Sequence, residues 1–83
     1  MSRFRLVRID PEQKAWRFYA ASVQPTLLGT FALVREWGRV GSPGRVQTQD
    51  YPSEEEAEAA LVKLRQAKER RGYIDAAEES ATE

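Results

Sequence analysis

The chain has 83 residues, no cysteine and no histidine, and its 13 basic residues balance its 13 acidic ones. A chain of this length forms one small domain with a thin core and no room for a deep enclosed pocket. The missing cysteines exclude disulfides and thiolate metal sites, which favours a cytoplasmic protein. Without histidine the chain also lacks the commonest general base and the commonest metal ligand, so we expect no enzyme, no metal site and no cofactor.

The balanced total charge hides an uneven distribution along the sequence. Residues 1–50 hold eight Arg or Lys against four Asp or Glu, whereas residues 51–83 hold five against nine. A mildly basic body followed by an acidic tail is compatible with an anionic partner. No apolar run is long enough for a signal peptide or a membrane span, so we expect no membrane partner.

Four segments have the pattern of β-strands. Residues 4–9 alternate apolar and basic side chains, residues 15–23 are rich in aromatics, and residues 30–40 alternate again. Residues 45–51 are so polar that we expect an edge strand there. Turn-forming Pro and Gly residues separate the four segments.

The segment after residue 51 predicts one helix. Ser53 and Glu56 have the spacing of a capping box, and the acidic first turn suits the helix dipole. Apolar residues follow at helical spacing, and Gly72 suits a C-terminal cap. The elements together predict an α+β fold, a four-stranded, mainly antiparallel β-meander with one C-terminal α-helix packed on one face. We expect this domain to take residues 1–74, followed by an acidic disordered tail at residues 75–83.

The run from Arg35 to Arg39 is the most informative segment of the third strand. Residues two apart point to the same face of a strand, so Arg35, Trp37 and Arg39 share one face if the strand has no bulge. An indole between two guanidinium groups suits stacking on a sugar or base while phosphates are held on either side. We expect this part of the strand to twist or bulge at Gly38, so that Trp37 lies on the side that the helix leaves bare.

Two plainer interpretations stay open for these residues. Trp37 can instead belong to the core, as a tryptophan of a small domain usually does. Trp16 has no basic residue two positions away and is the better candidate for the core tryptophan. Arg39 can instead form a surface ion pair with Glu36 or Asp50.

Trp37-Gly38-Arg39 resembles the signature of the WGR family, which is named for those three residues. The resemblance covers residues 4–74. An aromatic-rich strand precedes the tripeptide, Val40-Gly41 follows it, and a Ser/Glu-capped helix with a basic end leads to Gly72-Tyr73. The resemblance implies a non-enzymatic binding module. WGR modules of poly(ADP-ribose) polymerases help to recognise DNA strand breaks near a 5′ phosphate, and short free-standing bacterial proteins resemble them.

The resemblance implies that Trp37 and Arg39 contact DNA, with ends or nicks as the expected partner. The further candidate contacts with nucleic acid are Arg35, Arg45, Arg71 and Tyr73. Arg71 also has a plainer explanation, because basic residues favour a helix C-terminus. We expect no counterpart of the polymerases' catalytic domain, since the WGR unit takes up the chain. The alternative hypothesis is a protein–protein interaction adaptor or regulatory module that uses the same face.

Overall fold

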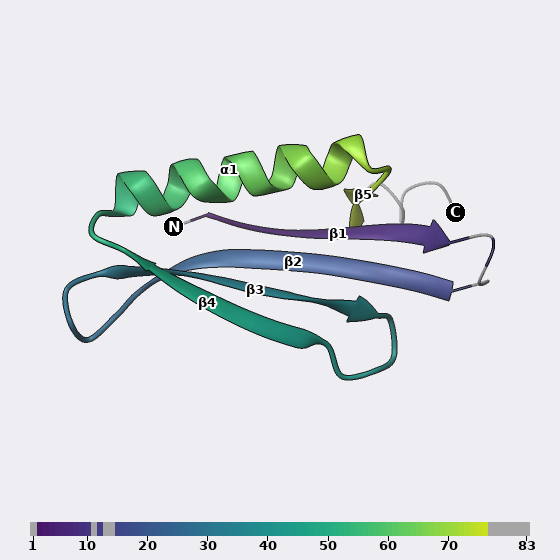
Figure 1. Cartoon of the computed structure of the whole chain (residues 1–83), viewed down its shortest axis with the longest axis horizontal. Coiled ribbons are helices and arrows are strands. Elements are labelled where there is room, and N and C mark those ends of the chain that lie inside the picture. Colours follow the sequence, from purple (N-terminus) through teal and green to yellow (C-terminus); the bar gives the residue numbers. More distant parts are fainter. Residues whose placement is uncertain (1, 11, 13–14, 77–83) are drawn as a thin grey trace.

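The computed structural model describes residues 2–10, 12 and 15–76 (Figure 1). The elements are β1 (Arg3–Asp10), β2 (Ala15–Pro25), β3 (Phe31–Arg39), β4 (Arg45–Tyr51), α1 (Glu54–Arg70) and β5 (Ile74–Asp75). The strands form one antiparallel sheet in the order β4-β3-β2-β1-β5. The predicted α+β class, the antiparallel pairing and the edge position of β4 are confirmed. The strand count is corrected to five.

The strand missed by the sequence analysis is β5, which pairs with β1 through Leu6 with Asp75 and Val7 with Ile74. Two residues are too few to show an alternating pattern. Asp75, expected at the start of the acidic tail, belongs to this strand and forms an ion pair with Arg65 at 3.1 Å. The remainder of the expected tail, from residue 77 on, lies outside the described residues.

Helix α1 begins and ends at the predicted caps. The Ser53 hydroxyl accepts a hydrogen bond from the Glu56 amide at 3.2 Å and donates one to the Glu56 carboxylate at 3.0 Å. At the other end Gly72 has a φ of 95°, and the amides of Gly72 and Tyr73 bond back to helix carbonyls as in a Schellman motif. In Figure 1 the helix begins beside the N-terminal end of β1 and ends near β5.

The main core lies between α1 and one face of the sheet, here called the helix face. Its buried residues are Phe4, Leu6, Tyr19, Ala21, Val23, Leu33, Ala57 and Leu61. Burial of each large apolar side chain contributes about 1.5–3 kcal/mol to stability. Alternation sends the intervening strand residues to the opposite face, here called the bare face. There Phe18 is buried beneath the Arg5 guanidinium, which lies 4.8 Å from the ring centroid.

Candidate functional site

Trp37 lies on the helix face, which corrects the expectation that it points to the bare side. β3 pairs with β2 in unbroken register from Phe31 to Arg39, so no bulge occurs at Gly38. Without a bulge, a residue an even number of positions from Leu33 must stay on the face of Leu33. Trp37 therefore joins the side of the sheet that packs on the helix.

The indole of Trp37 is partly buried at the margin of the core. Its ring stacks on Tyr19, with ring centroids 5.8 Å apart and ring planes inclined by 18°. Tyr19 in turn stacks on Phe4 at 6.4 Å and meets Tyr73 edge-on at 6.3 Å. The two interpretations of Trp37 are therefore each partly right, because the ring belongs to a packed aromatic row and still reaches solvent.

Trp16 is not the core tryptophan, contrary to the sequence interpretation. It lies on the bare face, is 41% exposed and pairs across the sheet with Ile9. The reason is its place in the alternation of β2. Tyr19 packs beneath the helix, and Trp16 is an odd number of positions from Tyr19, so the Trp16 side chain points to the opposite face of the sheet. The absence of a basic residue two positions away was therefore the wrong criterion for predicting that Trp16 is buried.

The strand register gathers three of the predicted arginines around Trp37. Arg35 and Arg39 flank it along β3, and Arg45 is its direct partner on β4. Nη2 of Arg35 donates a hydrogen bond to the Gln47 side-chain oxygen at 2.7 Å. Arg39 and Arg45 are exposed and have no ion-pair partner within the described part of the chain. Their guanidinium groups are therefore available to an external anion.

The proposed ion pair of Arg39 with Glu36 or Asp50 is wrong because of strand geometry. Glu36 is three residues from Arg39 on the same strand, so it points to the bare face. Asp50 pairs with Ala32, which also lies on the bare face. Neither carboxylate lies on the side of Arg39.

The C-terminal end of α1 adds positive charge beside Trp37. Nζ of Lys68 lies 4.4 Å from the centroid of the Tyr19 ring, a cation–π contact. Burial lowers the pKa of Lys68, and the charges of Arg71 and Arg35 lower it further. Because Arg71 is the C-cap residue of α1 and Arg35 lies on β3, charges from both elements act on Lys68, so the helix end and β3 form one basic area. Tyr73 reaches the same area through its contact with Tyr19.

The structure thus brings together all six candidate residues and one further cation. We call this set the Trp37 surface: Trp37, Arg35, Arg39, Arg45, Lys68, Arg71 and Tyr73. Lys68 was not predicted from the sequence, although it lies seven residues after Leu61 and so continues the core-facing stripe of α1. Arg8 and Arg17 were not predicted either, although alternation along β1 and β2 places them on the helix face.

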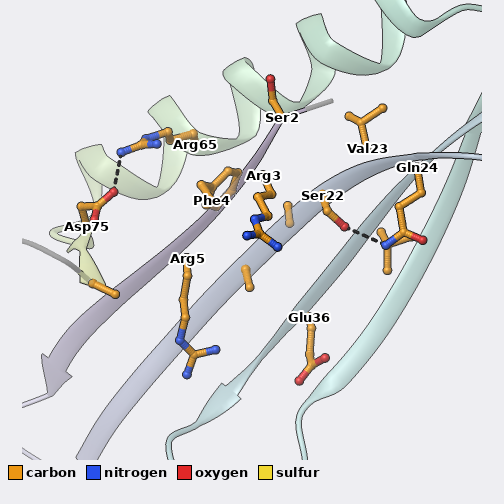
Figure 2. A pocket seen from close by; sticks show the side chains of 14 residues that line it. Ser2, Arg3, Phe4, Arg5, Ser22, Val23, Gln24, Glu36, Arg65 and Asp75 are labelled. Carbon is orange, nitrogen blue, oxygen red and sulfur yellow. Dashed lines mark hydrogen bonds and ion pairs between the residues drawn. The ribbon is translucent and has the colours of Figure 1, made fainter.

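A second candidate site is an open groove of about 780 Å³ on the bare face. Figure 2 shows Arg3 and Arg5 extending from β1 and Glu36 rising from β3. Along β2 the Gln24 amide donates a hydrogen bond to the Ser22 hydroxyl at 3.0 Å. The groove mixes both signs of charge and offers no exposed aromatic ring among its described lining residues. It is therefore less suited than the Trp37 surface to a polyanion with stacked bases.

Metal and membrane sites find no support in residues 2–10, 12 and 15–76. These residues contain no group of three acidic side chains that could hold a metal ion. They also form no helix with the length and apolar content that crossing a bilayer requires.

Fold and site define a class: a small α+β domain whose sheet carries an aromatic ring among arginines. The chain belongs to the WGR domain family, whose model matches residues 2–80. WGR domains are recognised as non-catalytic, nucleic-acid-binding modules.

One relative of known sequence illustrates the context of such a domain. The chain is 37% identical over 71 residues to the uncharacterized protein y4dW of Sinorhizobium fredii (strain NBRC 101917 / NGR234). The match covers 86% of this chain and 35% of that protein, so the chain spans about a third of the relative's length. No solved structure matches this chain.

Proposed function

We propose that this protein is a non-enzymatic module that binds DNA at ends or nicks through the Trp37 surface. The observation that carries the proposal is a partly exposed indole with arginines on three sides. β3 and β4 contribute Arg35, Arg39 and Arg45 to the helix face, and no carboxylate. This arrangement favours an anionic ligand that also has a flat face for stacking.

The packing of Trp37 prepares it for stacking. Tyr19 already holds the indole on one side, so the ring loses little conformational freedom when a ligand covers its exposed part. A base or sugar at a break is accessible to such a ring, whereas bases within an intact duplex are stacked on their neighbours. The contact is worth about 1–3 kcal/mol by comparison with other stacked bases. Arg39 and Arg45 then hold adjacent phosphates, so affinity falls as salt rises.

Fluorescence anisotropy with a nicked, 5′-phosphorylated duplex and an intact circular duplex tests the proposal. We expect Trp37→Ala to weaken binding to the nick by about 5- to 150-fold, with a smaller loss on intact DNA. Trp16→Ala is the matched control, because it removes an exposed tryptophan from the bare face. Since Trp37 also packs on Tyr19, each variant is first shown to be folded at the assay temperature. Equal affinity of Trp37→Ala and wild type for the nick would overturn the proposal.

A protein-interaction adaptor is the second candidate, and a feature of the bare face favours it. Ile9, Trp16 and Val40 are 53%, 41% and 44% exposed, and the Val40 amide bonds to the Trp16 carbonyl at 2.8 Å. Neighbouring exposed apolar side chains often mark a protein contact. In this case a stoichiometric partner survives nuclease treatment of the lysate, and Trp16→Ala loses it whereas Trp37→Ala keeps it.

A further inference from the structure

Three arginines form a row across the helix face, next to the row that contains Trp37. Arg8 on β1 is the direct partner of Arg17 on β2, and Arg17 is the direct partner of Arg39 on β3. All three have the parity of Tyr19 and Trp37, which places the row on the helix face. Neighbouring strands are about 4.8 Å apart, so the row extends roughly 10 Å from Arg8 to Arg39.

Such a row concentrates positive charge on one line across the sheet, because Arg8 with Arg17 and Arg17 with Arg39 are two cross-strand pairs of like charge in succession. Arg8 and Arg39, at the two ends, are exposed and have no hydrogen-bond or ion-pair partner within the described part of the chain. An anion lying along the row would pair with these two guanidinium groups.

The row also connects to the C-terminal end of α1. A Cβ placed on Gly72 would lie 3.7 Å from Nε of Arg8, so the Arg8 side chain runs past the helix cap. The helix dipole attracts a cation to this position, which accounts for Arg8 but not for Arg39 at the far end of the row. Arg8 and Arg71 together extend the positive area from β3 across to β1 and the helix end.

We propose that the row formed by Arg8, Arg17 and Arg39 binds the sugar-phosphate backbone of the DNA strand that continues from the nucleotide stacked on Trp37. The strand then crosses the sheet at right angles to the β-strands, from β3 towards β1. With 3.4 Å of axial rise per nucleotide in one strand of B-DNA, a row of about 10 Å faces at most about three nucleotides. This inference rests on the proposed function, because it takes Trp37 as the position of the break.

The salt dependence of binding to the nicked duplex tests the row. Arg8→Gln removes one phosphate contact, so the slope of log K against log salt should become shallower by about 0.7–0.9. Arg3→Gln is the matched control, since it makes the same charge change on the same strand, at an exposed position on the bare face. Its slope should stay within 0.2 or so of wild type, because it removes no phosphate contact.

A neutral methylphosphonate at one of the first four phosphates from the nick then locates the contact. Wild type should lose affinity at one of these positions, and Arg8→Gln should be insensitive at that same position. Arg8→Gln and Arg3→Gln can give the same salt-dependence slope while Trp37→Ala still binds the nicked duplex more weakly than wild type does. In that case the arginine row does not bind phosphates, and only this inference fails. If wild type has no preference for the nick and Trp37→Ala binds like wild type, the proposed function itself fails.

Discussion

The turn between β3 and β4 packs tightly against the sheet at Gly44. A Cβ added to Gly44 would lie 2.8 Å from Cζ of Phe18 and 2.8 Å from the carbonyl oxygen of Trp37. The Phe18 ring is only 5% exposed, and the Trp37 carbonyl belongs to the backbone of a central strand, so neither atom can yield easily. We therefore expect Gly44→Ala to cost about 1–3 kcal/mol through overpacking. For a domain of this size that cost lowers the thermal midpoint by about 4–24 °C.

Thermal and urea unfolding, followed by circular dichroism, measure the effect of Gly44→Ala. Ser42→Ala in the same turn is the control, because Ser42 is exposed and its substitution should change stability by less than about 0.5 kcal/mol. In a double-mutant cycle with Phe18→Leu, the cost of Gly44→Ala should shrink, since the ring tip that opposes the new methyl group is gone. A Gly44→Ala protein as stable as wild type would show that the turn does not press on Phe18.

Two further predictions concern α1. Ser53→Ala removes the N-cap and should cost about 1 kcal/mol in urea unfolding; an unchanged midpoint would mean that the cap contributes nothing. Lys68→Gln should bind DNA more weakly, because it removes a cation from the Trp37 surface. Its effect on stability should depend on pH, because burial and the charges of Arg71 and Arg35 lower the pKa of Lys68 from its ordinary value. The penalty on the charged amine is fully present below the folded pKa and is relieved as pH rises through it, so the stability of wild type relative to Lys68→Gln, measured from pH 7 upwards, should rise; a constant difference contradicts this reasoning.

Features set by neighbouring residues could be predicted from the sequence. The four long strands follow from alternation and composition, and the helix limits follow from the Ser53–Glu56 spacing and from Gly72. Each of these signals acts within a few residues. β5 could not be predicted, because its two residues gain their structure from pairing with β1 and from the ion pair of Asp75 with Arg65.

The face of the sheet that carries Trp37 was predicted wrongly for a physical reason. Alternation tells which residues share a face, and without a bulge it places Trp37 on the face of Leu33. The error came from a bulge assumed at Gly38 to separate the two. Gly38 instead lies against Gly44, where an added Cβ would come within 3.1 Å of the Gly44 Cα. The glycine serves close approach of the turn, and the strand stays regular.

In the candidate site too, the residues placed by one strand or turn could be predicted from the sequence, whereas the residue placed by helix packing could not. The arrangement of Arg35, Trp37 and Arg39 follows from one strand, and Arg45 follows once the turn to β4 is recognised. Lys68 joins them only because α1 packs across the sheet with its end above Tyr19. The contribution of each residue to DNA binding stays a prediction.

The most direct test of the account is an NMR titration of isotope-labelled protein with a nicked, 5′-phosphorylated duplex at two ionic strengths. The two indole N–H signals report on opposite faces of the sheet, because Trp37 lies on the helix face and Trp16 on the bare face. The account predicts saturable shifts of the Trp37 indole and of the Arg39 and Arg45 amides, weaker at the higher ionic strength, with Trp16 unchanged. A shift of the Trp16 indole signal with no shift of the Trp37 indole signal would contradict the account.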